Sequence, residues 1–393
     1  MQRRRAEGAA GARPGNPAAA VARGYRLPVS VPEPAKAAAL PPVPDEVLAP
    51  DGTPRFGAFL GVPPRVALGG LAAPYARGAV ADLLRHKRWM YVFAATDELM
   101  IAAAVVDAGA TATTFVMVTD RSTGDVIADA SRPGAFRPLV RLNDRPETGF
   151  RAHYYAPGTK VTMRGDGGRL RTSTRIHRLP FVPRVSQPWI DLELDMTTTA
   201  HQGLTAVTEL HTPQPAVTTT AKNAALPTSG RLVVRGRDGH AAGWDLGGGY
   251  GGFDFTSGHL PRETSWRWAY GTGRTSTGRP AGLNVTSGFT GMEDRASENS
   301  LWADGRITLL DPAARIDCDP GDLMGPWRIK TLDAAADLVF EPIGLHREGL
   351  NLGVLRSHFI QAQGHLSGTV TLNDEQVVFE RFPAVTEDQH VLW

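Results

Sequence analysis

The sequence has a single cysteine, no long apolar run and no excess of one charge, and each shortage excludes a class of protein. Cys318 is the one cysteine, so no disulfide can form within the chain. No stretch approaches the ~20 apolar residues of a membrane helix, so stable membrane insertion is not expected. The 42 basic and 40 acidic side chains nearly cancel, without the basic stripe of a nucleic-acid-binding protein. No apolar segment follows the basic start, so the sequence predicts no signal peptide and a cytoplasmic location.

Residues 1–52 are predicted to be a disordered tail. The first 50 residues hold 13 alanines and nine prolines, and Tyr25 is their sole aromatic residue. Such a segment buries too little apolar surface to offset the entropy of ordering it. A soluble globular body is expected after the tail, because hydrophobic residues make up 42% of the chain and charged residues 21%.

Beyond the tail, short strand patterns alternate with turn signals. Trp189–Met196 alternates apolar and acidic residues, which is the period of a half-buried strand. Hairpins are predicted where Gly165–Gly168 and Asp304–Gly305 separate apolar runs. Apart from a short helical pattern after Ala79, convincing amphipathic helices are lacking. The pattern predicts a mainly β protein of two antiparallel halves, each a lipocalin-like barrel or a sandwich.

Proline spacing sets the predicted boundary between these halves. The stretch Leu210–Gly230 contains three prolines and interrupts the strand patterns. We therefore predict an N-terminal β-rich half over residues 53–226 and a C-terminal half over residues 227–393.

Cofactor and metal motifs are missing or out of context. Gly247–Gly252 fits the spacing of a dinucleotide-binding loop, but no helical periodicity follows it to bind a phosphate. We interpret this segment as a loop where backbones approach closely. The eleven histidines are scattered without the spacing of zinc ligands, so neither a cofactor nor a metal is expected.

The second half concentrates tryptophans and acidic residues. Six of the eight tryptophans lie from Trp244 onward, and Trp266 and Trp268 share one strand face. The catalytic candidates among them are Asp254, Glu298, Glu387 and His390.

Two interpretations of this cluster remain open. The tryptophans either fill a core whose polar neighbours satisfy strand ends, or they wall a cavity with convergent polar groups. In a cavity, a buried carboxylic acid acquires a raised pKa and protonates a substrate, and indole faces stabilise the resulting cation. Glu387 and His390 are either an acid with its partner or a structural latch.

Short motifs over residues 55–393 form an ordered series: Arg85–Tyr91, Thr114–Gly124, Thr220–Lys222, Tyr250–Gly258, Trp266–Ala269, Gly282–Asn284, Glu298–Gly305 and Glu387–Trp393. This series resembles the bacterial domain-of-unknown-function 2804 family, which has no assigned activity. The resemblance implies a fold similar to the paired lipocalin-like barrels of the carotenoid hydratase and tocopherol cyclase group. Members of that group bind hydrophobic isoprenoids, and some protonate a double bond. The ligand-binding candidates are Lys222, Trp266, Trp268, Asn284, Asn299 and Trp302.

The leading hypothesis is a hydrophobic small molecule held in the second half, with acid-assisted hydration, cyclisation or isomerisation if the protein is an enzyme. Asp254, Glu298 or Glu387 would donate the proton. Three alternatives stay open: a non-catalytic binding protein of the same fold, a carbohydrate-active β-sandwich with tryptophan platforms and two carboxylates ~5–10 Å apart, and a structural protein without a cavity. The oligomeric state is not predicted.

Overall fold

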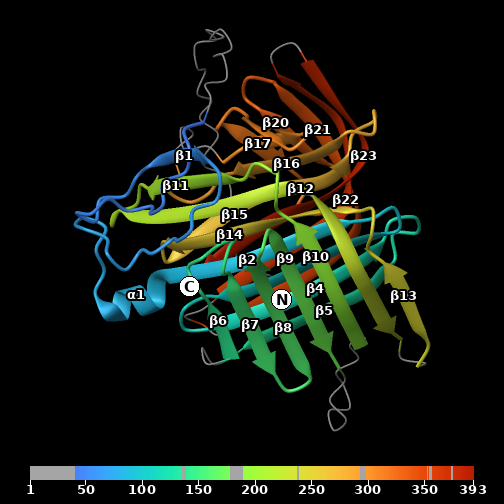
Figure 1. Cartoon of the computed structure of the whole chain (residues 1–393), viewed down its shortest axis with the longest axis horizontal. Helices are drawn as coiled ribbons and strands as arrows, with labels where there is room; N and C mark the ends of the chain where they lie inside the picture. The colour runs from blue at the N-terminus through green and yellow to red at the C-terminus, as the bar shows by residue number, and fades with distance from the viewer. Residues whose placement is uncertain are drawn as a thin grey trace, which may run out of the picture. The chain divides into compact units, whose positions relative to one another are not determined.

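A computed structural model of the chain describes residues 40–134, 139–177, 189–236, 239–292, 298–351, 353, 356–372 and 375–393. Within these ranges the chain forms 23 strands and one short helix, α1 (Ala79–Arg85). Figure 1 shows how these elements are arranged. No helix in this part of the chain is long and apolar enough to cross a membrane. The prediction of a mainly β protein is confirmed.

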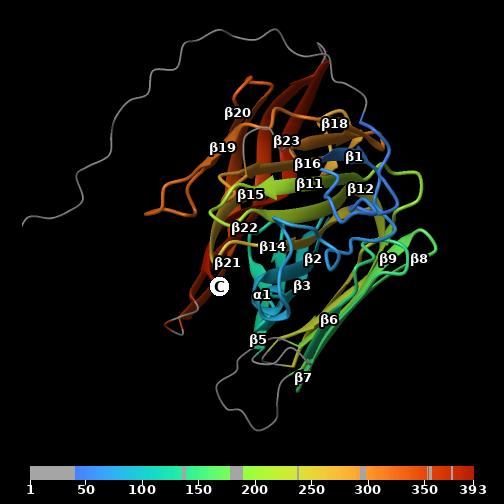
Figure 2. The same ribbon diagram turned by 90° about the vertical axis from the view of Figure 1, so that its left-hand side faces the viewer.

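Fourteen strands form a first curled antiparallel sheet (Figure 2). They are β1 (Gly57–Leu60), β2 (His86–Ala95), β3 (Leu99–Asp107), β4 (Ala112–Asp120), β5 (Val126–Gly134), β6 (Val140–Leu142), β7 (Arg151–Ala156), β8 (Thr159–Asp166), β9 (Arg169–Ile176), β10 (Trp189–Thr197), β11 (Leu204–Leu210), β12 (Ala216–Arg235), β13 (Ala241–Asp245) and β14 (Tyr250–His259). The main path runs β5-β4-β3-β2-β14-β12-β10-β9-β8-β7-β6. Strands β11 and β13 pair with β12, and β1 pairs with β11.

Nine further strands form the second antiparallel sheet, in the order β18-β17-β16-β15-β23-β22-β21-β20-β19. Their bounds are β15 (Glu263–Arg274), β16 (Pro280–Ser287), β17 (Ser300–Ala303), β18 (Arg306–Leu309), β19 (Ala314–Asp317), β20 (Trp327–Thr331), β21 (Ala336–Asn351), β22 (Arg356–Leu372) and β23 (Glu375–Leu392). The two sheets are curled antiparallel half-barrels, which confirms the prediction of two antiparallel β halves.

The sheets divide the chain later than the proline spacing predicts. The predicted boundary after residue 226 falls inside β12, which is one strand of 20 residues. Pro227 follows a β-bulge between Asn223 and Leu226, and a bulge is a place where a strand tolerates proline. Strand β14 then completes the first sheet between β2 and β12, so the second sheet begins with β15.

Part of the predicted tail packs on the sheets. Pro42 forms a parallel bridge with Leu60, and Val47 is buried in the core of the first sheet. The remainder of the predicted tail, residues 1–39, lies outside the described residues.

Several local predictions agree with the strands observed. Strand β10 alternates buried residues with more exposed ones, as the period of Trp189–Met196 predicts. The predicted hairpins correspond to the β8–β9 and β17–β18 pairs. The glycine-rich segment leads into β14, where a Cβ on Gly252 would lie 1.7 Å from Tyr270 Oη. Residues 247–249 lie in a turn before β14, and a Cβ on Gly249 would lie 2.5 Å from the Ala95 carbonyl oxygen. The predicted loop with close backbone approach is therefore confirmed at these residues, and the segment continues into the strand.

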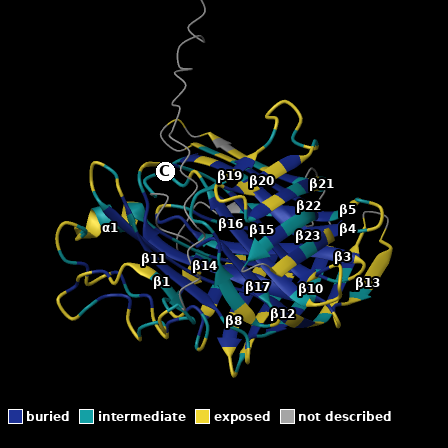
Figure 3. Cartoon of the chain, turned by 90° about the horizontal axis from the view of Figure 1, so that it is seen from above, coloured by how far each residue is buried: buried dark blue, intermediate teal, exposed yellow. Residues whose placement is uncertain are grey.

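Apolar side chains gather inside each curl and between the two sheets. The core of the first sheet includes Phe253 and Phe255 of β14, and the core of the second includes Trp327 and Phe340. A third cluster lies between the sheets and contains, among others, Tyr91, Phe93, Trp268, Tyr270 and Trp302. Figure 3 shows these buried stretches running along the strands while α1 stays exposed. The layer between the sheets is where the site described next is found.

Candidate functional site

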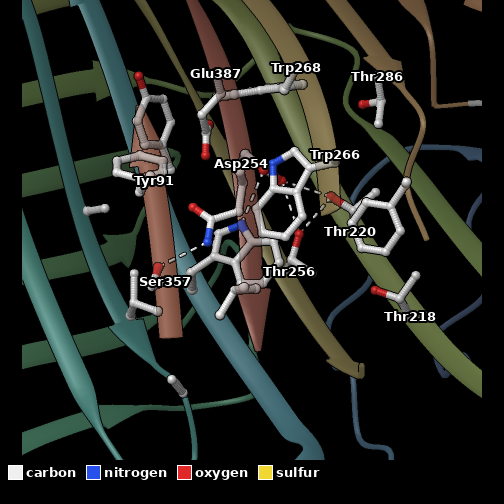
Figure 4. Close-up of a pocket in the computed structure, with 18 of the residues that line it drawn as sticks. Tyr91, Thr218, Thr220, Asp254, Thr256, Trp266, Trp268, Thr286, Ser357 and Glu387 are labelled. Atoms are coloured by element: carbon white, nitrogen blue, oxygen red, sulfur yellow. Dashed lines mark hydrogen bonds between the residues drawn. The ribbon is translucent and has the colours of Figure 1, made fainter. Parts of the chain in front are cut away.

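A cavity of about 370 Å³ lies between the two sheets (Figure 4). One wall comes from strands β2, β3, β4, β12 and β14 of the first sheet, and the other mainly from β15, β22 and β23 of the second. This volume lies in the lower part of the ~300–1,000 Å³ range of small-molecule sites. The sequence predicts a cavity within the second half, but the first sheet supplies one of its two walls.

Aromatic rings from both sheets meet at the cavity. Trp89 of β2 stacks on Trp266 of β15, with ring centroids 6.0 Å apart and planes at 13°. Trp266 stacks in turn on Phe289 at 5.4 Å. Tyr91 meets Trp268 edge to face at 5.2 Å. These rings give the cavity a largely apolar, π-rich lining.

Lys222 is the charged centre of the polar part of the lining. Strand pairing sets Lys222 of β12 directly opposite Asp254 of β14, and its Nζ lies 3.0 Å from Asp254 Oδ1. The same Nζ lies 3.6 Å from Glu298 Oε1 and 5.2 Å from the ring centroid of Trp268. Burial alone would lower the pKa of Lys222, but the two carboxylates more than offset it and raise the pKa above its usual value. Lys222 therefore stays a cation among apolar groups.

Besides Lys222, three donors hold the Asp254 carboxylate in one orientation. Thr220 Oγ1 donates to Oδ1 at 2.8 Å, and Thr256 Oγ1 donates to the same oxygen at 3.3 Å. Trp89 Nε1 donates to Oδ2 at 3.2 Å. Figure 4 shows Thr220, Thr256 and Asp254 converging on one side of the cavity. Asp254 thus acts as a fixed acceptor rather than as a mobile side chain.

Glu298 is positioned by residues of the β15–β16 pair. Its Oε1 accepts a hydrogen bond from the Thr286 hydroxyl. Asn284 Nδ2 donates to the Glu298 carbonyl at 2.7 Å, and Trp268 Nε1 donates to Asn284 Oδ1 at 2.7 Å. Asn284 therefore links a cavity tryptophan to the backbone of a cavity carboxylate, and it does not itself line the cavity.

Glu387 is a buried acid on the wall formed by the second sheet. Strand pairing places it between Trp268 of β15 and Gln361 of β22. Burial and, after it, the charge of Asp254 raise the pKa of Glu387 from 4.5 to about 8, although Lys222 lowers it in part. Glu387 accordingly carries its proton at neutral pH.

His390 lies outside this group, contrary to the predicted pairing with Glu387. The two residues are three positions apart on β23, and odd separations put side chains on opposite faces of a strand. His390 Nε2 lies 3.0 Å from Glu263 Oε1, and its side chain is 58% exposed. The acid and the histidine therefore have different partners.

Asn299 and Trp302 support the site from behind. Asn299 Oδ1 accepts a hydrogen bond from the Thr286 backbone N–H at 2.8 Å. Trp302 is buried between the sheets, and its Nε1 donates to the Gln202 carbonyl at 2.7 Å. The predicted site residues that do line the cavity are Lys222, Asp254, Trp266, Trp268, Glu298 and Glu387.

Of the wall from the first sheet, the sequence patterns identify Lys222 and Asp254 but not the residues beside them. Trp89 and Tyr91 lie two positions apart and so share one face of β2. Thr218, Thr220 and Lys222 likewise share one face of β12. Polar residues at every second position of a strand are a signal for such a face, but the nearby prolines led this segment to be interpreted as a boundary.

The cavity carboxylates already have a cation. Asp254 and Glu298 both face the Lys222 ammonium, which takes the place that a bound metal ion would need. Among the described residues, one group of three side chains offers ligand atoms close enough to hold a metal, and it comprises Asp82, His86 and His259. That group belongs to the other face of the first sheet.

The chain is similar in structure to several solved proteins at low sequence identity. They include CghA with Sch210972 (TM-score 0.47, 11% identity, covering 84% of this chain and 98% of that one). Kievitone hydratase from Nectria haematococca gives a TM-score of 0.41 at 11% identity, covering 82% and 94%. An AttH-type protein from Nitrosomonas europaea gives 0.37 at 11%, covering 82% and 98%.

No curated protein matches the chain. The sequence profile of one family, described as a domain of unknown function (DUF2804), matches residues 43–393. The match includes every motif on which the resemblance was based, and the chain belongs to the DUF2804 family.

Proposed function

We propose that the protein binds an apolar small molecule between its two sheets and that Glu387 protonates it. The observation that carries this proposal is the position of Glu387, a buried carboxyl group on the wall of an aromatic cavity. Burial disfavours the carboxylate form, so the group retains a proton that it can donate. A general acid of this kind contributes ~10²–10⁴-fold to a rate.

The lining favours a ligand with an apolar, unsaturated body. Trp89, Trp266 and Trp268 present ring faces and edges to the cavity, and apolar molecules gain most from such surroundings. The charged groups Lys222 and Asp254 are engaged with each other. Affinity would therefore come mainly from burying the ligand against the rings.

The chemistry is a proton transfer to carbon. The O–H bond of Glu387 breaks, a C–H bond forms at one end of a carbon–carbon double bond, and a carbocation remains at the other end. Addition of water with loss of its proton gives hydration. Attack by a second double bond, followed by loss of a proton from the cyclised carbocation, gives cyclisation. Loss of a proton next to the first carbocation gives isomerisation. In each case a released proton returns to the Glu387 carboxylate and restores the acid.

The surroundings of Glu387 suit a cationic intermediate. The indole faces of Trp266 and Trp268 can each stabilise a cation, by ~0.5–2 kcal/mol per ring. Lys222, Asp254 and Glu298 together carry one formal negative charge, because two carboxylates face one ammonium. This charge acts in the low dielectric of the cavity, where it favours a nearby positive centre.

Extraction of the purified protein tests binding. Organic extracts from the native host's protein are compared by mass spectrometry with those of a Trp266→Ala, Trp268→Ala variant. Trp189→Ala is the matched control, because Trp189 lies on β10 away from the cavity and is 40% exposed. We expect a stoichiometric apolar compound in the wild type and the control, and its loss from the double variant. An empty wild-type protein would contradict the proposal.

Deuterium exchange tests catalysis with the compound so identified. Incubation in D₂O should place deuterium on carbon with the wild type and not with Glu387→Gln, which keeps the shape of the side chain but has no acidic proton. Binding that survives in Glu387→Gln, without conversion by either protein, would instead identify a non-catalytic binding protein.

A further inference from the structure

A cluster of two histidines and one aspartate lies on the face of the first sheet that points away from the cavity. His86 of β2 and His259 of β14 are paired across the strands, with ring centroids 5.1 Å apart. Helix α1 ends where β2 begins and brings Asp82 over both rings. Asp82 Oδ1 lies 2.8 Å from His259 Nε2 and 3.9 Å from His86 Nδ1.

We propose that Asp82, His86 and His259 bind a divalent transition-metal ion of the zinc class. Their ligand atoms all lie within 4.8 Å of one another. Two imidazole nitrogens and one carboxylate oxygen suit Zn²⁺, Co²⁺ or Ni²⁺ and leave a coordination position open, as in three-ligand zinc sites. Mg²⁺ and Ca²⁺ prefer oxygen ligands throughout, so this set selects against them.

The two histidines are arranged as ligands. His86 Nε2 lies 2.9 Å from Ser257 Oγ, a contact that fixes the ring with Nδ1 toward Asp82, as hydrogen bonds behind metal ligands do. Burial lowers the pKa of His86 to about 4 and also lowers that of His259.

The aspartate supplies the adjustable part of the site. Metal–ligand bonds of ~2.0–2.2 Å at tetrahedral angles set ligand atoms ~3.3–3.6 Å apart. Asp82 Oδ1 must therefore shift, because it lies 2.8 Å from His259 Nε2 and 3.9 Å from His86 Nδ1. Asp82 can move, because it lies on a helix of seven residues and its side chain is 43% exposed. The same exposure gives an ion in solution direct access to the cluster. Figure 1 shows α1 at the edge of the molecule beside the start of β2.

Neighbouring charges sharpen the choice of ion. Three arginines lie near the histidines and repel a cation there. Arg77 lies in the loop before α1 and Arg85 at the end of α1, both near His259, and Arg88 lies on β2 near His86. Arg88 Nη2 lies 2.5 Å from Asp107 Oδ2, and Arg77 donates to the carbonyl of Ala76 at 3.0 Å, so both are directed to other partners. The repulsion that remains weakens the binding of all divalent cations alike. Only an ion that gains strong bonds to imidazole nitrogen overcomes it.

This site is independent of the function proposed for the cavity. Side chains of β2 and β14 alternate between faces, so His86 and His259 point away from the face that carries Trp89 and Asp254. A bound ion would fasten α1 to the paired ends of β2 and β14. Its expected effect is on stability, without a requirement for any ligand in the cavity.

Metal binding is tested with the full chain carrying no polyhistidine tag, stripped with a chelator and titrated with ZnCl₂ by calorimetry at pH 7. CoCl₂ titration gives a second readout through the visible absorption of Co²⁺ bound by nitrogen ligands. We expect one ion per chain and a rise in Tm with Zn²⁺. Asp82→Asn and His86→Asn should each weaken binding by at least about tenfold.

The matched control is His153→Asn, because His153 lies on β7 outside the cluster. It should bind Zn²⁺ like the wild type. Asp82→Asn decides the outcome if His86→Asn does not fold, since the Asp82 side chain is 43% exposed and its replacement disturbs the core less. The proposal is overturned if the wild type does not bind Zn²⁺, or if Asp82→Asn binds it with unchanged affinity and stoichiometry.

Discussion

Replacing Lys222 by methionine tests how much the Lys222 ammonium stabilises the fold by neutralising Asp254 and Glu298. Methionine keeps most of the side-chain volume and removes the charge. Asp254 and Glu298 would then lose the ammonium that lies 3.0 Å and 3.6 Å from their oxygens in the folded protein. Lys222 is 2% exposed, so its loss leaves two buried carboxylates without their counter-ion. Removing one partner from a buried ion pair costs ~3–5 kcal/mol, and we expect the free energy of unfolding to fall by that amount.

An exposed ion pair provides the matched control. Lys330 Nζ lies 2.8 Å from Asp337 Oδ2, but the two side chains are 51% and 57% exposed. Exposed pairs contribute ~0–1 kcal/mol, so Lys330→Met should change stability little. Urea unfolding followed by tryptophan fluorescence measures both variants at pH 7. Adding Asp254→Asn to Lys222→Met should recover part of the loss. A Lys222→Met variant as stable as Lys330→Met would refute the reasoning.

Three further outcomes follow from the same contacts. Because the pKa of Glu387 is raised on folding, its protonation stabilises the folded protein in full below pH 4.5, and this stabilisation is lost as the pH rises to about 8. Glu387→Gln should therefore flatten the dependence of the free energy of unfolding on pH over that range. Asp254→Asn should lower the pKa of Glu387, because the Asp254 charge helps to raise it, and ¹³C NMR titration of the carboxyl would show no change if the two were uncoupled. Gly252→Ala should lower the free energy of unfolding in urea by ~1–3 kcal/mol, because its Cβ would lie 1.7 Å from Tyr270 Oη. Gly349→Ala is the control, because a Cβ at that position would meet no atom within 4 Å.

The strands were predictable from sequence because their signals are local. Trp189–Met196 shows the period of two that β10 displays, and Asp304–Gly305 forms the predicted turn between β17 and β18. The prolines predict a boundary between halves where the long strand β12 is in fact continuous. Pro227 is accommodated beside a bulge in β12, and no local pattern distinguishes that position from a linker.

The cavity could be predicted only in part because it depends on which sheet faces meet. Trp266 and Glu387 stood out within the second half, yet Trp89 stacks on Trp266 from the other sheet. His390 was included because it is near Glu387 in sequence, but the alternation of a strand separates them. The Asp82–His259 contact joins positions 177 apart, so no local spacing of ligand residues predicts the cluster.

The place of β14 between β2 and β12 has a consequence for the order in which the protein is made. Trp89 of β2 and Asp254 of β14 are 165 positions apart, so this pairing closes a long loop and is slow compared with a hairpin. Until β14 has left the ribosome, β2 and β12 each present an open strand edge on which other chains can pair. The edges of β2 and β12 are covered only when β14 pairs with both strands, and the same step brings Asp254 to Lys222.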